Sequence, residues 1–183
     1  MFQSLSNAHL DWSLITIGLV DERAVPPQHD ASNEGLVRRT LLQGRAAAAK
    51  FLPMWSDAAD VANVATALYQ PLTPFDFILL GMGDDGHTAS WFPAAKNLND
   101  AMDGDDRTVV AIDAAGCPVA GDVTNRITLT RSAVTSARHA VLLIFGDEKR
   151  CVIETAMTHP AADYPVSAAT EGLGSRLTIC GLI

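Results

Sequence analysis

The chain contains few of the residues that would indicate a secreted, membrane-bound or nucleic-acid-binding protein. Only three cysteines occur in 183 residues and none forms a C-x-x-C pair, which argues against a disulfide framework and a zinc site. Lysine and arginine number 13 against 21 acidic residues and are scattered, so no basic surface for nucleic acid is expected. No apolar run approaches about 18 residues, and the N-terminus lacks the basic and apolar regions of a signal peptide. These absences predict a cytoplasmic protein that binds neither nucleic acid nor membrane.

The composition that remains is that of an ordinary folded domain. Hydrophobic residues make up 48% of the chain and charged residues 19%, which is typical of a protein with a packed core. A length of 183 residues falls within the roughly 100 to 200 residues of one domain. We therefore expect a single domain over residues 1–183, and the sequence leaves its oligomeric state open.

Three runs are apolar at nearly every position, at residues 14–20, 75–81 and 139–146. Such runs are typical of strands that are buried on both faces of a parallel sheet. Shorter strand patterns occur at residues 108–113, 126–130 and 176–180.

Helical patterns lie between these runs and begin with capping residues. The caps are predicted at Ser32 or Asn33, at Ser56 or Asp57, and at Asp147. The alternation of strands with helices predicts an α/β domain with a mostly parallel sheet, in which ligands bind beyond the carboxyl ends of the strands.

The stretch "GMGDDGHTAS" follows the second apolar run and raises three interpretations. Gly81, Gly83 and Gly86 match the dinucleotide pattern G-x-G-x-x-G, but two aspartates inside the loop would repel a pyrophosphate. A glycine-rich turn without further function is the second interpretation. The third is a general base, because Asp85 could fix the tautomer of His87 and stabilise its protonated form. A histidine near an aspartate is more often a structural pair, so the residues alone leave these alternatives open.

Cationic side chains stand at the ends of three predicted strands. Arg23 offers the planar fork that suits phosphate or carboxylate, although its loop could be only a charged turn at the end of a strand. Arg126 is a similar cation at the start of a predicted strand, although it could be a surface arginine there. Lys149 is predicted in the first turn of a helix, where the macrodipole disfavours a cation by about 0.3 to 1 kcal/mol unless an anion lies nearby. A helix N-terminus also binds phosphate, whereas a surface ion pair with Asp147 or Glu148 is the alternative.

Four ordered stretches together resemble the 6-phosphogluconolactonase family: "LVDERAVPPQHDASNEGLVRRTLL", "FDFILLGMGDDGHTASWFP", "NRITLT" and "VLLIFGDEKR". The resemblance implies a Rossmann-like three-layer α/β fold that is shared with the glucosamine-6-phosphate deaminases. It also implies hydrolysis of 6-phospho-D-glucono-1,5-lactone to 6-phospho-D-gluconate in the pentose phosphate pathway. No metal or organic cofactor is implied, and the partner is a small sugar-phosphate lactone.

The resemblance also implies roles for individual residues. His87 would be the general base that activates water, with Asp85 holding it in place. The deaminases carry a glutamate five residues after this histidine, and Phe92 stands there in this chain, which favours the lactonase over a deaminase-like isomerase. The residues expected to contact the substrate are Asp21, Arg23, Gly83, Arg126 and Lys149.

The chain departs from the family at both ends. Members that resemble it begin with another strand and a Gly-Gly-x-Thr-Pro loop that helps to hold the phosphate, and neither precedes residue 14 here. We therefore expect an N-terminally shortened chain without the first strand and with weak or no activity, and a sugar-phosphate-binding remnant without turnover is an alternative. The C-terminal "RLTICGLI" is expected to be a final strand or an altered tail.

Overall fold

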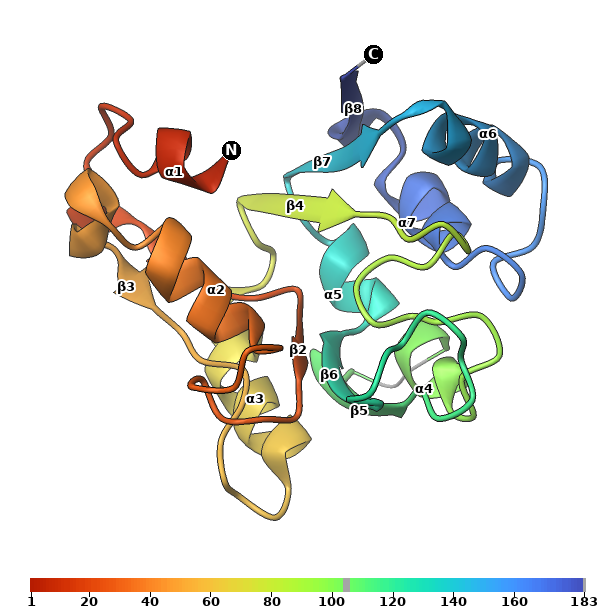
Figure 1. The fold of residues 1–183 in the computed structure, drawn as a ribbon, viewed down its shortest axis with the longest axis horizontal. Helices are drawn as coiled ribbons and strands as arrows, with labels where there is room; N and C mark the ends of the chain where they lie inside the picture. Colours follow the sequence, from red (N-terminus) through yellow and green to blue (C-terminus); the bar gives the residue numbers. More distant parts are fainter. Residues whose placement is uncertain (104–105, 183) are drawn as a thin grey trace.

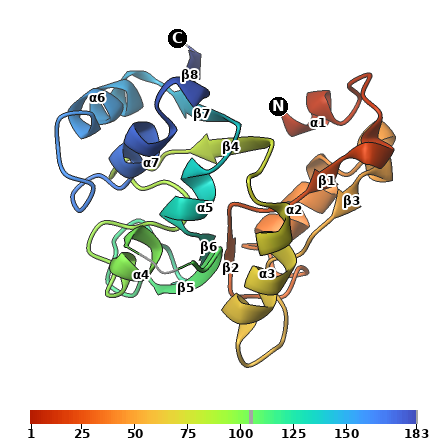
Figure 2. The same ribbon diagram turned by 180° about the vertical axis from the view of Figure 1, so that it is seen from behind.

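The computed structural model describes residues 1–103 and 106–182, which form a mixed α/β protein. Figure 1 and Figure 2 show an N-terminal group of elements on one side and a parallel sheet with its helices on the other. An antiparallel sheet lies below the parallel sheet in these views, and its edge strand faces the N-terminal group. The predicted α/β class is thus confirmed. None of the helices in these residues is long and apolar enough to cross a membrane.

The main parallel sheet contains three of the predicted strands. β4 (Phe77–Gly81) pairs with β7 (His139–Phe145), and β7 pairs with β8 (Leu177–Leu182), so the strand order is β4-β7-β8. The C-terminal stretch is therefore a strand, as one of the two expectations had it. The carboxyl ends of β4 and β7 lead into the His87 loop (residues 82–92) and into the helix that carries Lys149.

The described residues contain the three predicted helices and further helices that were not predicted. The helices of these residues are α1 (Phe2–Leu5), α2 (Asn33–Thr40), α3 (Val61–Tyr69), α4 (Leu98–Met102), α5 (Arg131–Thr135), α6 (Asp147–Ala156) and α7 (Val166–Leu173), with 3-10 turns at Trp12–Leu14, Gly44–Ala48, Gln70–Leu72 and Gly174–Arg176. The predicted ones are α2, α3 and α6.

The caps of three helices decide where the helices begin. Ser32 caps α2 as predicted, because its hydroxyl accepts a hydrogen bond from the backbone N–H of Gly35. The prediction for α3 was wrong, since Asp60 accepts from the N–H of Asn63 and the helix starts after it. The prediction for α6 was also wrong, because the preceding glycine, at φ 87°, is the cap residue and Asp147 lies in the first turn.

The strands of the main sheet are covered more fully on one face than on the other, unlike the prediction of burial on both faces. Leu80 and Leu142 are 2% and 0% exposed, whereas Phe77 and Phe145 on the opposite face are 59% and 50% exposed. α6 packs against β7, and Ile153 of α6 is buried there. Runs of consecutive apolar residues therefore do not guarantee that helices cover both faces.

A second sheet is antiparallel and contains Asp21 and Arg23. β2 (Asp21–Arg23) pairs with β6 (Asn125–Leu129), which also pairs with β5 (Val109–Asp113). A charged turn was one interpretation of Arg23, and it was wrong because residues 21–23 find their backbone partners in β6. The register sets Arg23 directly opposite Arg126.

The strand predicted at residues 14–20 is reduced to β1 (Thr16–Ile17), which pairs in parallel with β3 (Lys50–Phe51). The ladder stops because the hydroxyl of Tyr69 takes the place of a strand partner. It accepts a hydrogen bond from the N–H of Leu19 at 2.9 Å and donates one to the carbonyl of Leu52 at 3.0 Å. The buried Tyr69 therefore ends the pairing and directs the chain toward β2.

Candidate active site

The His87 loop holds an imidazole and a carboxylate in direct contact. The ring Nδ1 of His87 donates to Oδ1 of Asp85 at 2.6 Å, and the backbone N–H of His87 donates to the same oxygen at 3.1 Å. Because Nδ1 carries the proton in this pair, the lone pair of Nε2 is available to accept one. The predicted pair of Asp85 and His87 is therefore brought together in the geometry that a general base needs.

The environment of Asp85 keeps its carboxyl group ionised. Burial by itself would raise the pKa of Asp85, but the hydrogen bonds and the charge of His87 outweigh it and lower the pKa below its ordinary value. A carboxylate stabilises the imidazolium that forms when His87 takes a proton, so the pair is suited to proton transfer.

The glycines of this loop make room for the histidine. A Cβ at Gly83 would overlap the ring of His87, and the N–H of Gly83 is already bonded to the carbonyl of His87 at 2.8 Å. Gly86 has φ 77°, and a Cβ there would lie 2.6 Å from Cδ1 of Tyr164. The glycine pattern therefore reflects close packing around His87 and does not need a bound nucleotide to explain it.

We expect Gly86→Ala to lower the free energy of unfolding by about 1 to 3 kcal/mol, because it combines left-handed backbone strain with a clash. Gly116→Ala is the matched control, since Gly116 has φ 91° but a Cβ there meets no atom within 4 Å. Urea unfolding should show the larger loss for Gly86→Ala. Equal losses in the two variants would contradict the packing role of Gly86.

The two arginines form a second cluster across the β2–β6 ladder. Nη2 of Arg126 donates to the carbonyl of Ala120 at 2.5 Å, and Nη1 of Arg23 donates to the carbonyl of Ala31 at 2.8 Å and to Oδ1 of Asn33 at 2.9 Å. The Nε atoms of both arginines are buried and have no hydrogen-bond partner within the described residues. Unsatisfied donors on paired cations favour the binding of an anion.

The electrostatics of the two arginines also favour a bound anion. Burial of Arg126 and the nearby charge of Arg23 lower the pKa of Arg126, and the carboxylates of Asp21 and Glu22 oppose that shift. A cavity of about 220 Å³ opens beside the pair and is lined by Arg23, His29, Ala31, Ala120, Gly121, Asp122, Val123 and Arg126. We call it the arginine cavity.

Phe92 connects the two clusters. Its ring lies 4.5 Å from the ring of His87, centroid to centroid, and the guanidinium carbon of Arg126 lies 5.4 Å from the centroid of the same ring. Phe92 is only 2% exposed, so it is a fixed spacer between the imidazole and the arginine. An apolar ring therefore occupies the position where a deaminase would carry a glutamate.

Asp21 is held between strand β2 and the His87 loop. Its Oδ2 accepts from the hydroxyl of Ser90 at 2.7 Å, and its backbone carbonyl accepts from Nδ2 of Asn33 at 2.9 Å. Ser90 is fully buried and was not singled out from the sequence, whereas Asn33 was considered only as a cap. These contacts place Asp21 at the junction of the two clusters.

Lys149 lies against the His87 loop and not in the arginine cavity. Its Nζ donates to the carbonyl of Met82 at 2.5 Å and lies 3.6 Å from Oδ1 of Asp84. The alternative ion pair with Asp147 or Glu148 does not form, because the first turn of α6 directs the lysine toward the loop. The partly buried lysine supports the loop through its bond to the carbonyl of Met82 and lies near the exposed carboxylate of Asp84.

Glu22 is a buried residue beside the site that sequence reasoning missed. It is completely buried, and its carboxylate accepts hydrogen bonds from the hydroxyl of Ser32 and from the backbone N–H groups of Arg23, Asn33 and Glu34 at 2.7 to 3.0 Å. It therefore joins strand β2 to the first turn of α2 beside the arginine cavity. A charged residue that follows an apolar run is normally predicted to be solvent-exposed. No local sequence pattern indicates that Glu22 is buried.

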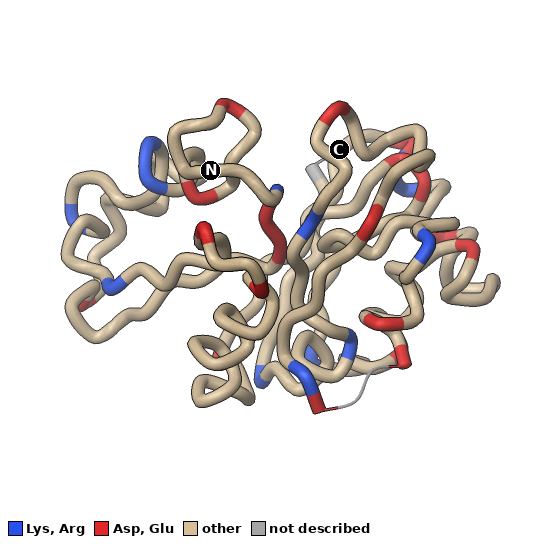
Figure 3. The backbone as a smooth tube through the Cα atoms, turned by 90° about the horizontal axis from the view of Figure 1, so that it is seen from below, with Lys and Arg blue, Asp and Glu red and all other residues tan. Residues whose placement is uncertain are grey.

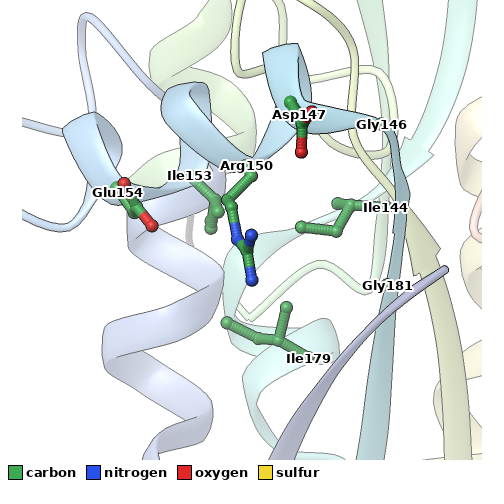
Figure 4. Close-up of a pocket in the computed structure, with 8 residues that line it drawn as sticks. All are labelled: Ile144, Gly146, Asp147, Arg150, Ile153, Glu154, Ile179 and Gly181. Atoms are coloured by element: carbon green, nitrogen blue, oxygen red, sulfur yellow. The ribbon is translucent and has the colours of Figure 1, made fainter. Parts of the chain in front are cut away.

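A larger cavity of about 300 Å³ lies elsewhere, between α6 and β8 (Figure 4). Ile144, Ile153 and Ile179 form its apolar wall, and its cation Arg150 stands between two carboxylates of the same helix. It contains none of the predicted site residues and no imidazole, so the chemistry favours the smaller cavity.

Lys and Arg are spread over many elements of the described chain and do not form one basic face (Figure 3).

Comparison with known proteins identifies the family. The chain matches the family described as "Glucosamine-6-phosphate isomerases/6-phosphogluconolactonase" over residues 1–178. It belongs to this family. Within residues 1–103 and 106–182, no group of three or more His, Cys, Asp or Glu residues could hold a metal ion.

Individual members of the family are similar over nearly the whole chain. The 6-phosphogluconolactonase of Xylella fastidiosa is 40% identical over 183 residues, which are 98% of this chain and 76% of the relative. That of Rhizobium meliloti is 41% identical over 185 residues, covering 97% and 77%. The crystal structure of a 6-phosphogluconolactonase from Shewanella baltica superposes with a TM-score of 0.87 at 35% identity, covering 98% and 77%.

Proposed function

We propose that this chain hydrolyses 6-phospho-D-glucono-1,5-lactone to 6-phospho-D-gluconate, as the names of its relatives suggest. The observation that carries the proposal is the position of the Asp85–His87 pair beside two arginines with unsatisfied donors, with Phe92 between them. An imidazole base and a pair of arginines that approach the same aromatic ring suit a substrate that has an ester at one end and a phosphate at the other.

The reaction follows from the tautomer of His87. Nε2 takes a proton from water while the water oxygen attacks C1 of the lactone, and Asp85 stabilises the resulting imidazolium. The bond from C1 to the ring oxygen then breaks, and Nε2 returns the proton to that oxygen. The product is a carboxylic acid with a free hydroxyl group at C5, and the sequence of steps requires no cofactor and no covalent intermediate.

The remaining predicted residues have supporting roles in this proposal. Arg23 and Arg126 hold the phosphoryl group, and Asp21 lies close enough to the clusters to contact a sugar hydroxyl. Lys149 supports the His87 loop and is the third cation proposed to contact the substrate. Gly83 leaves the space that the imidazole occupies. A cytoplasmic location is part of the same proposal and fits the three free cysteines.

A deaminase-like isomerase is the second candidate in this family. Such a reaction would need a carboxylate for its proton relay near His87, and the apolar ring of Phe92 stands there instead. This contact favours the lactonase.

The test compares the two reactions with one preparation of the chain. Acid release from freshly prepared 6-phosphogluconolactone, corrected for spontaneous hydrolysis, is expected to depend on enzyme concentration. Ammonium release from glucosamine 6-phosphate is expected to remain at background. Ammonium release without lactone hydrolysis would overturn the assignment, and phosphate-ligand binding without either reaction would support the remnant without turnover.

A further inference from the structure

His29 lines the arginine cavity together with Arg23 and Arg126, and the family resemblance assigns it no role. Its loop connects β2 to α2 and consists of turns with defined hydrogen bonds. The N–H of His29 donates to the carbonyl of Pro26 at 2.9 Å, and its carbonyl accepts from the N–H of Ser32 at 2.9 Å. The imidazole is therefore carried by an ordered segment at the rim of the cavity.

A backbone hydrogen bond determines the tautomer of His29. The N–H of Ala31 donates to Nδ1 of the ring at 3.1 Å, so Nδ1 is an acceptor and Nε2 carries the proton. Nε2 has no hydrogen-bond partner in the described part of the chain. The exposed ring thus presents one N–H donor whose orientation is set by the main chain.

Ala31 also orients Arg23. The carbonyl of Ala31 accepts from Nη1 of Arg23 at 2.8 Å, while its N–H holds the ring of His29. The two donors are therefore placed by consecutive peptide groups. Arg126 contributes a third donor group from the opposite strand.

We propose that His29 is a further binding residue that donates from Nε2 to the phosphoryl group of the substrate and so contributes to the preference for phosphorylated lactones. This inference rests on the proposed function and deepens it. Two guanidinium groups supply the charge, and the neutral imidazole adds a directed donor to a tetrahedral anion that has more oxygens than the two arginines can satisfy.

Kinetics with two lactones test the role. His29→Ala is expected to raise KM for 6-phosphogluconolactone about tenfold, the effect of one hydrogen bond to a charged group, with kcat within about twofold. The values for unphosphorylated glucono-1,5-lactone should not change. His29→Gln keeps a side-chain N–H donor and should restore much of the loss, whereas the exposed His9→Ala is the control without effect.

Calorimetry with 6-phosphogluconate and with inorganic phosphate gives a second readout that requires no turnover. We expect binding to weaken about tenfold in His29→Ala and to remain unchanged in His9→Ala. If His29→Ala weakened phosphate binding but the wild-type chain had no lactonase activity, the proposed reaction would be wrong and the binding role of His29 would still hold. Equal affinities of wild type and His29→Ala, or equal losses with both lactones, would overturn it.

Discussion

Replacing His87 with alanine is expected to lower kcat/KM for 6-phosphogluconolactone by about 10²- to 10⁴-fold, the usual contribution of general acid–base catalysis. The loss should appear mainly in kcat, because in the proposed reaction His87 acts on the water and the ring oxygen, whereas the arginines would hold the phosphate. The assay measures acid release at several substrate concentrations and subtracts the uncatalysed rate. Binding of 6-phosphogluconate should stay within a few-fold of wild type.

Two variants separate catalysis from a general effect on folding. Asp85→Asn keeps the shape of the side chain but cannot stabilise an imidazolium, so it should lose activity while its unfolding transition remains cooperative. His139→Ala removes an exposed histidine at the start of β7 and should be as active as wild type. Activity of His87→Ala near the wild-type level would contradict the assignment of the base.

Replacing Arg126 with methionine is expected to have opposite effects on ligand binding and on stability. The variant should bind 6-phosphogluconate about 100-fold more weakly, because it lacks the buried guanidinium that we propose contacts the phosphate. The free energy of unfolding without ligand should stay equal or rise, because Arg126 is buried opposite Arg23 and has an unsatisfied Nε. Calorimetry and thermal unfolding measure the two effects on the same sample.

Arg138→Met is the matched control for Arg126→Met. Arg138 forms a surface ion pair with Asp76 at 3.3 Å, and both side chains are well exposed, so neither affinity nor stability should change much. If Arg126→Met unfolded at a lower temperature and still bound 6-phosphogluconate normally, Arg126 would be a structural residue and the arginine cavity would not be the phosphate site.

The outcome of each sequence prediction depended on how local its cause was. The pair of Asp85 and His87 could be predicted because a single residue separates them along one loop, so local geometry brings the side chains together. The cap at Ser32 was equally local. The end of β1 could not be predicted, because it depends on the hydroxyl of Tyr69, which arrives from a helix some fifty residues later.

By itself, the sequence determined the α/β class, the contact between Asp85 and His87, and the family, because periodicity, short spacings and ordered motifs are properties of the linear chain. Only the tertiary structure decided that Asp21 and Arg23 lie in an antiparallel strand and that Arg23 faces Arg126, because the register between β2 and β6 joins segments about a hundred residues apart. It also decided that Glu22 is buried and that Lys149 faces the His87 loop. These features depend on which backbone groups and charges the fold brings together, and no local pattern in the chain encodes that.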